Sequence, residues 1–202
     1  MMLTTFLLLA LCLVTHGQQD LVLSQGSCPD IPVQLNFDLK RFEGYWKVYE
    51  AFGAPYMVGM SCVDFIFEQA SDDGRYVNIR LEGDRDVKVL GFKIWTANEI
   101  YYGKGTVLDD VTDAGWSVLF GGKPDNYEDR TNYFILATDY VNYAIVYSCI
   151  QPAKLPIISE SCFILLRRNG SPPAEVSTHK FILKSYGVNV TNLNKVNNYN
   201  CY

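Results

Sequence analysis

The sequence predicts an all-β fold, an antiparallel barrel or sandwich, with one helix near its C-terminus. Between residues 44 and 168, short segments in which apolar and polar residues alternate are separated by turn residues, which is typical of half-buried antiparallel strands. Their even spacing, in a chain with 14 Tyr and 11 Phe, favours a barrel or a sandwich. The expected strands are 45–51, 62–68, 76–81, 87–95, 99–107, 115–120, 132–138, 142–149 and 161–167, of which 87–95 can instead continue the strand before it.

Two neighbouring segments carry the clearest strand signal. In 62–68 the side chains of Phe65 and Phe67 share one face, and 76–81 alternates throughout. The residues between them include 71–74, Ser-Asp-Asp-Gly, which is a strong signal for a turn. The two segments are therefore expected to pair as a β-hairpin.

A helix is expected over residues 172–186. Ser171 can cap its first turn, two prolines suit that turn, and Gly187 can end the helix. One stripe of the helix can pack on a sheet; it consists of Val176, His179, Lys180, Leu183 and Tyr186. The polar, Asn-rich tail 188–202 needs a tether through Cys201 in order to be ordered.

Composition excludes several classes of function. Apolar residues make up 49% of the chain and charged residues 19%, so the chain can bury a core and is not disordered. The formal net charge of -5 argues against nucleic acid as a partner. The two histidines, His16 and His179, lie off the predicted strands, which disfavours a zinc triad, a histidine-held haem and a Ser-His or Cys-His couple. We therefore predict a protein that is not an enzyme, with no metal site, no catalytic residue and no required cofactor.

Residues 1–17 have the pattern of a secretory signal peptide. The apolar stretch 6–14 is too short to span a bilayer, and Thr15 and Gly17 suit the −3 and −1 positions of a cleavage site. We therefore predict a secreted, extracellular protein in which residues 18–202 form a single domain. No later apolar run reaches the ~18 residues of a membrane-spanning helix. Two sequons mark candidate glycosylation sites, Asn169 and Asn189.

Three motifs, in order along the chain, resemble those of the lipocalin family. The segment 36–46, NFDLKRFEGYW, resembles the N-F-D-x-x-[KR]-[FY]-x-G-x-W motif with which these proteins open. The segment 138–143, TDYVNY, resembles the second motif, and 164–167, ILLR, resembles the third, in which a basic residue ends the last barrel strand. The motif positions are Gly44, Trp46, Thr138, Asp139, Tyr140 and Arg167. Within the family, the chain is most similar to bilin-binding and carotenoid-carrying members.

The resemblance implies a single lipocalin domain, an eight-stranded antiparallel up-and-down barrel with the helix packed outside. Its parts are the barrel at about 44–168, the helix at about 172–186 and the tethered tail 188–202. Trp46 would fill the closed end of the barrel, and a guanidinium stacked on its indole would add cation–π attraction. Arg167 is the expected partner, with Arg168 as the neighbouring alternative.

Five cysteines remain once Cys12 leaves with the signal peptide, and their wide separations favour disulfides over zinc. The resemblance implies two pairs, Cys28–Cys149 and Cys62–Cys201. Cys162 is left over. We expect it to be buried under the helix, beneath Leu183 and Tyr186; the other outcome is a disulfide to a partner chain, or a homo-oligomer.

Strand parity then predicts which side chains face the barrel interior and are candidates for binding a ligand. They are Phe65, Phe67, Ile79, Leu81, Val118, Phe120, Tyr133, Ile135, Phe163 and Leu165. Ala137 and Glu50 are also expected to face inward, with Glu50 near the mouth beside a polar ligand group or, more commonly, as a solvated acid. The apolar segment 53–60 is expected to form the entrance.

The resemblance implies a carrier of a small hydrophobic ligand. A biliverdin-like tetrapyrrole or a carotenoid is the sharpest expectation, and a lipid, sterol or pheromone fits the same lining. Two alternatives are an enzyme of the same fold that uses Cys162 as its nucleophile, and an oligomeric structural pigment protein. Parity argues against the first, because Cys162 is adjacent to the inward Phe163 and should point away from the interior.

Overall fold

The computed structural model describes residues 22–108, 114–121, 130–151, 157–167 and 172–201 of the chain. The predicted signal peptide, the helix cap Ser171, the sequon at Asn169 and the alternative arginine Arg168 lie outside these residues. None of the helices within them is long and apolar enough to cross a membrane.

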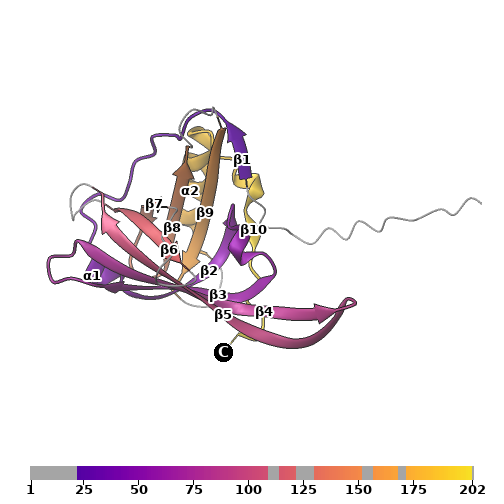
Figure 1. The fold of residues 1–202 in the computed structure, drawn as a ribbon. Coiled ribbons are helices and arrows are strands. Elements are labelled where there is room, and N and C mark those ends of the chain that lie inside the picture. Colours follow the sequence, from indigo (N-terminus) through magenta and orange to yellow (C-terminus); the bar gives the residue numbers. More distant parts are fainter. Residues whose placement is uncertain (1–21, 109–113, 122–129, 152–156, 168–171, 202) are drawn as a thin grey trace, which may run out of the picture.

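Eight strands close into an antiparallel barrel, as predicted (Figure 1). Each strand pairs with the next along the chain, and the last pairs with the first, which closes the sheet. The barrel strands are β2 (Gly44–Phe52), β3 (Met60–Gln69), β4 (Tyr76–Val89), β5 (Phe92–Val107), β6 (Gly115–Gly121), β7 (Arg130–Thr138), β8 (Tyr143–Ile150) and β9 (Ile157–Leu166). Two short strands extend the sheet: β1 (Val22–Gln25) pairs with β9, and β10 (Asn194–Lys195) pairs with β2.

The helix α2 (Ala174–Ser185) packs against the outer wall of the barrel, as predicted. It begins after Pro173, and Gly187, with φ at +89°, ends it in the left-handed conformation that favours glycine. Val176 and Leu183 are its buried side chains. Three shorter helices complete the description: α1 (Leu39–Phe42), η1 (Pro55–Met57) and η2 (Val190–Asn192).

The closed end of the barrel is built on Trp46, which is fully buried. Its indole N–H donates to the carbonyl of Phe42 at 2.8 Å. The guanidinium of Arg167 lies 4.0 Å from the centre of the Trp46 ring and also donates to the carbonyls of Arg41 and Phe42. A Cβ on Gly44 would lie 3.0 Å from this guanidinium, and Gly44 has φ at +99°, so glycine is required there on two grounds.

The turn between β7 and β8 contains the other motif residues. The carboxylate of Asp139 accepts hydrogen bonds from the backbone N–H groups of Val141, Asn142 and Tyr143. These bonds lower the pKa of Asp139 although its partial burial acts the other way. Tyr140 lies in the left-handed conformation with φ at +66°. Asp139 thus holds the turn, while the ring of Tyr140 packs against the interior cluster beside Phe37 at the closed end.

Segment 87–95 is not one separate strand; its first part, 87–89, continues the strand before it, which was the alternative expectation, and the rest does not. It contains the end of β4, a turn at Leu90 and Gly91, and the start of β5. Both turn residues have positive φ, the geometry of a two-residue hairpin turn that usually contains Asn-Gly. Leucine is not a usual residue in such a turn, so the turn could not be predicted from the sequence.

Two β-bulges overturn the predicted inward positions of Glu50 and Ala137. The register shifts between Val48 and Glu50 in β2, and between Ile135 and Ala137 in β7. A bulge adds one residue and reverses which side chains face the interior. Glu50 therefore faces outward and forms an ion pair with Lys180 of α2, while Ala137 packs in the outer cluster under α2.

Two disulfides tie the ends of the chain to the barrel, and they are the two pairs that the resemblance implies. Cys28 is joined to Cys149 at the end of β8, and Cys62 in β3 is joined to Cys201 in the tail. The tail also follows β2, because the N–H of Val196 donates to the carbonyl of Tyr49 at 3.0 Å. The Asn-rich tail is thus fixed by both covalent and hydrogen bonds.

Candidate ligand-binding site

The ten predicted ligand-facing side chains come together inside the barrel. Nine of them are buried in one apolar cluster, and Phe120 packs against it while partly exposed. They come from five strands: Phe65 and Phe67 from β3, Ile79 and Leu81 from β4, Val118 and Phe120 from β6, Tyr133 and Ile135 from β7, and Phe163 and Leu165 from β9. Regular alternation along these stretches explains why period-two parity placed these side chains on the inner face; that they bind a ligand stays a prediction.

Aromatic rings form a nearly continuous path through this interior. Near the mouth, which is the end of the barrel opposite Trp46, the rings of Tyr56 and Phe120 lie 6.2 Å apart between centres. Phe120 lies 5.8 Å from Tyr133, and Tyr133 lies 6.3 Å from Phe163. Edge and offset contacts at these distances are the favoured aromatic geometries. The rings thus form one contiguous apolar interior.

A pair of tyrosine hydroxyls provides polarity within this apolar surface. The hydroxyl oxygens of Tyr56, in η1, and Tyr133, in β7, lie 3.3 Å apart. A single hydrogen bond between two hydroxyls uses one proton, so the second remains available to donate. Tyr133 is among the predicted lining residues, whereas Tyr56 is not, although it lies in the predicted entrance segment 53–60.

Both phenols stay neutral well above neutral pH. Burial is the main cause that raises the pKa of Tyr133 to about 12, against an ordinary value of 10.0. Burial also raises the pKa of Tyr56, and the neighbouring Tyr133 adds to this effect. A neutral phenol donates a hydrogen bond, so the pair suits an oxygen acceptor on a guest.

These pKa values predict a loss of stability at alkaline pH. The unfolded chain ionises its tyrosines near pH 10.0, whereas folded Tyr133 resists until about pH 12, so stability is lost as the pH rises through that interval. The shift corresponds to about 2–3 kcal/mol from Tyr133. Urea unfolding at pH 9 and pH 11.5 should show a smaller loss in Tyr133→Phe than in the parent. An equal loss in both would contradict the assignment.

An ion pair fixes the mouth beside the hydroxyl pair. The guanidinium of Arg85 bonds both carboxylate oxygens of Glu99 at 2.7 and 2.8 Å, across β4 and β5. Arg85 also donates to the backbone carbonyls of Tyr56 and Val58. Its hydrogen bonds hold the pKa of Glu99 below the ordinary value. Arg85 thus joins η1 to the β4–β5 hairpin. This contact links distant segments, so no local sequence pattern predicts it.

Cys162 lies on the opposite side of the barrel wall from this site. Its side chain is fully buried in the outer cluster with Leu183 of α2, while Tyr186 is 40% exposed and lies outside that cluster. Burial is the main cause that raises the pKa of the thiol to about 12. His179 also lies on this outer side, 3.2 Å from the Tyr143 hydroxyl. Neither residue is placed to act on a guest inside the barrel.

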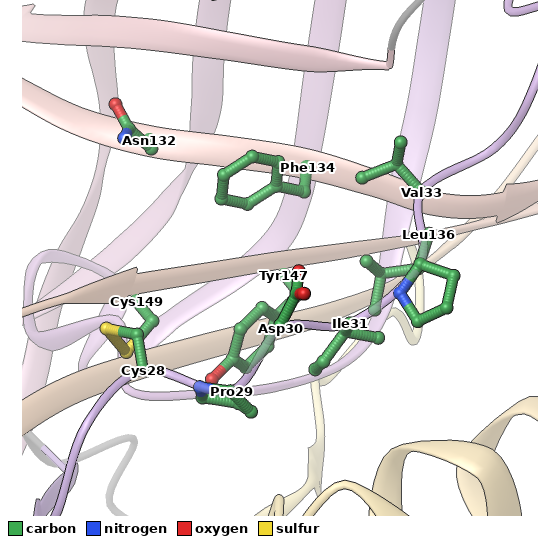
Figure 2. A pocket seen from close by; sticks show the side chains of 11 residues that line it. Cys28, Pro29, Asp30, Ile31, Val33, Asn132, Phe134, Leu136, Tyr147 and Cys149 are labelled. Atoms are coloured by element: carbon green, nitrogen blue, oxygen red, sulfur yellow. A yellow bond between two sulfur atoms is a disulfide. The ribbon is translucent and has the colours of Figure 1, made fainter.

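A separate hollow lies on the outer wall, between the N-terminal segment and strands β7 and β8 (Figure 2). It encloses about 530 Å³, and its lining includes Asn132, Phe134, Leu136 and the disulfide between Cys28 and Cys149. Phe134 and Leu136 alternate with the inward Tyr133 and Ile135 along β7. None of the ten predicted ligand-facing residues lines this hollow.

Comparison with known proteins agrees with the architecture. No protein-family model matches the chain. It is 30% identical to apolipoprotein D of Bos taurus over 179 residues, which cover 87% of this chain and 85% of that protein. It is also 30% identical over 147 residues to the Lazarillo protein of Schistocerca americana, covering 71% of this chain and 62% of that protein.

Solved structures share the fold at lower sequence identity. Insecticyanin from the tobacco hornworm Manduca sexta has a TM-score of 0.69 at 18% identity, over 90% of this chain and 91% of that one. Lobster apocrustacyanin A1 has a TM-score of 0.63 at 20% identity, over 87% and 91%. With the closed eight-stranded barrel, the three motifs and the identity to apolipoprotein D along most of both chains, this protein belongs to the lipocalin family.

Proposed function

We propose that this protein is a secreted carrier that holds a small hydrophobic molecule inside its barrel. The observation that carries the proposal is the meeting of ten apolar and aromatic side chains from five strands around one interior, with a hydroxyl pair beside the mouth. A largely apolar lining with a few polar groups is typical of small-molecule sites. Two disulfides and the predicted signal peptide support an extracellular location.

The chemistry of the lining favours a conjugated guest that bears an oxygen acceptor. The aromatic path suits an extended flat ligand, and the spare phenolic proton of Tyr56 or Tyr133 suits a carbonyl or carboxylate. A biliverdin-like tetrapyrrole and a keto-carotenoid both meet this description, as the motif resemblance also implies. A fatty acid or a sterol also carries an oxygen acceptor and fits the same hydroxyl pair, but neither offers the extended conjugated system that the aromatic path suits.

The alternative of a thiol enzyme receives no support from the site. Cys162 faces α2 instead of the interior, and its raised pKa keeps it protonated. The alternative of an oligomeric pigment protein concerns assembly and is decided by the oligomeric state in solution. Asn189 is exposed, which supports its proposed glycosylation.

Phe163→Asp is expected to abolish binding of biliverdin or of a retinoid probe. Phe163 is fully buried at the centre of the aromatic path, 5.2 Å from Phe65, so a carboxylate there removes apolar surface and repels the guest. Quenching of tryptophan fluorescence measures the affinity, and circular dichroism reports the fold. The matched control is Phe181→Asp, because Phe181 is 73% exposed on α2. A folded Phe163→Asp protein that binds as tightly as the parent would refute the site.

Tyr133→Phe tests the same site without placing a charge in the core. Loss of one hydroxyl should weaken biliverdin binding by about 3- to 10-fold and leave binding of a hydrocarbon carotenoid unchanged, because only biliverdin offers an acceptor. The absorption spectrum of protein purified from its source, together with solvent extraction of its ligand, identifies the natural guest. A colourless extract that contains a fatty acid or sterol would overturn the pigment assignment and retain the carrier.

A further inference from the structure

The β4–β5 hairpin extends beyond the barrel at the mouth (Figure 1). The last residue of β4 that pairs with β3 is Arg85, opposite Met60. Beyond it, residues 86–89 and 92–96 pair only with each other within the described part of the chain, so they form a two-stranded ribbon. Arg85 and its ion pair with Glu99 fix the base of this ribbon to the entrance segment.

The ribbon has one apolar and one polar face. Val87 lies opposite Trp95, and Val89 lies opposite Phe92, which places these four side chains on one face. The other face carries Asp86, Lys88, Lys93 and Thr96, and its Asp86 bonds both Lys93 and Thr96. A register shift leaves Ile94 as the extra residue of a bulge, which keeps the two faces separate on both strands.

The apolar side chains of the ribbon are exposed to solvent. Leu90 at the tip is 93% exposed, Phe92 is 75% exposed and Trp95 is 55% exposed. Leu90 occupies a position with φ at +51°, where leucine is disfavoured and Asn or Gly is usual. The tip therefore carries an apolar side chain at a cost in backbone energy, which indicates a role for the side chain itself.

The charge of the ribbon is opposite in sign to that of the whole protein. The ribbon, residues 86–96, contains Lys88, Lys93 and Asp86, a formal charge of +1 in which Asp86 pairs with Lys93, whereas the chain has a formal net charge of -5. From the tip towards the body of the protein, the ribbon presents apolar side chains, then lysines, then a tryptophan. A lipid interface presents its acyl chains and headgroups in the same order. Anionic headgroups would complement the lysines, while the tip enters the acyl region.

We propose that this ribbon docks the mouth of the barrel on an anionic lipid surface. Leu90, Phe92 and Trp95 insert, and Lys88 remains at the headgroups. The inference extends the proposed function, on which it rests for the nature of the cargo, because a hydrophobic guest resides in lipid and would enter a barrel whose mouth faces it. A second copy of the chain is the competing occupant. Two such tips would bury only a few side chains against each other, well short of the roughly 1,000 Å² of a stable protein interface, whereas an apolar tip of this size is sufficient to insert in lipid.

Vesicle binding by the full mature protein tests the proposal. Trp95 is the exposed tryptophan, whereas Trp46 and Trp116 are buried, so its emission reports on the ribbon. With vesicles of phosphatidylcholine containing about 30% phosphatidylserine, we expect co-sedimentation, a blue shift and quenching by brominated acyl chains. Vesicles of phosphatidylcholine alone should bind several-fold less. Absence of binding, or equal binding to both vesicles, overturns the proposal.

A double variant, Leu90→Asn with Phe92→Thr, should reduce partitioning into the anionic vesicles by about a hundredfold. Asn suits the turn and Thr suits the strand, so the hairpin is kept. Phe181→Gln, an equally exposed apolar site on α2, should bind as the parent does. Undiminished vesicle binding by the double variant overturns the proposal. Analytical ultracentrifugation tests the competing occupant. If the parent is a dimer, the double variant is a monomer and neither binds vesicles, the proposal is also overturned.

Failure of this inference is distinguishable from failure of the carrier function. Titration with biliverdin in solution, without vesicles, should give the same affinity for the parent and the ribbon variant, because the ribbon lies outside the interior. Unchanged titration without vesicle binding refutes lipid docking alone. Absence of any guest binding, with vesicle binding intact, refutes the carrier and leaves the ribbon as a lipid-binding element.

Discussion

Replacement of Cys62 and Cys201 by serine is expected to lower the free energy of unfolding by about 5 kcal/mol. The disulfide joins residues 139 positions apart, and on the chain-entropy model a loop of this length restricts the unfolded chain by about that amount. Domains of this size are stable by about 5–15 kcal/mol, so the variant would lose a large part of its stability. The tail from Val188 to Cys201 should also lose protection against hydrogen exchange.

Denaturant unfolding in a Cys162→Ser background measures this effect without thiol exchange. Cys162→Ser with both disulfides intact is the matched control, and it isolates the disulfide from the loss of the buried thiol. The contacts of the tail with β2, such as that of Val196 with Tyr49, remain in the variant. If these contacts are sufficient to hold the tail without the disulfide, the free energy of unfolding would fall by less than about 1 kcal/mol. That result would contradict the entropic account of the disulfide.

Much of the barrel followed from local pattern. Alternation along β3, β4 and β9 placed Phe65, Ile79 and Phe163 in the interior, because a half-buried strand repeats every two residues. Gly187, just after the apolar stripe of the helix, predicted the end of α2, because glycine readily adopts the left-handed conformation that ends a helix. These features depend on a few neighbouring residues, and so the sequence displays them.

The expectations that failed depend on register between strands. Glu50 and Ala137 each follow a bulge, and one added residue moves every later side chain to the other face. A bulge without a glycine has no residue that marks it. Glu50 is stabilised outside only because Lys180 reaches it from α2, a residue 130 positions away.

Parts of the site that sequence analysis missed join segments that are distant in the chain. The hydroxyls of Tyr56 and Tyr133 meet across 77 positions, and Arg85 reaches Tyr56 across 29. In the sequence these are a tyrosine among 14 and an arginine in a charged run. Their function as a polar group at the mouth exists only after the barrel closes. The exposed ribbon was also not predicted, because Leu-Gly at positions 90–91 is not one of the residue pairs typical of a two-residue hairpin turn.

Cys162 is expected to react with a thiol reagent at pH 8 about a thousandfold more slowly than an unhindered cysteine. The thiolate is the reactive form, and burial raises the pKa of Cys162 from 9.0 to about 12, so the thiolate is about a thousandfold rarer at that pH. Steric cover by Leu183 slows access further. One thiol should titrate in denaturant and none in Cys162→Ser.

The same measurement tests the thiol-enzyme alternative and a disulfide between two chains through Cys162. A nucleophile at Cys162 would require a thiolate that is accessible from the interior, and a disulfide to a partner chain would require a thiol at the surface. Fast reaction in the folded protein, or a dimer on non-reducing electrophoresis that Cys162→Ser removes, would contradict the buried position. The thiol can also be labelled in denaturant and the chain then refolded. A bulky label under α2 should disrupt the packing of Cys162 on Leu183, so biliverdin binding as tight as in the unlabelled protein would contradict burial. We therefore expect the labelled chain to refold poorly, which is the result that a structural thiol requires.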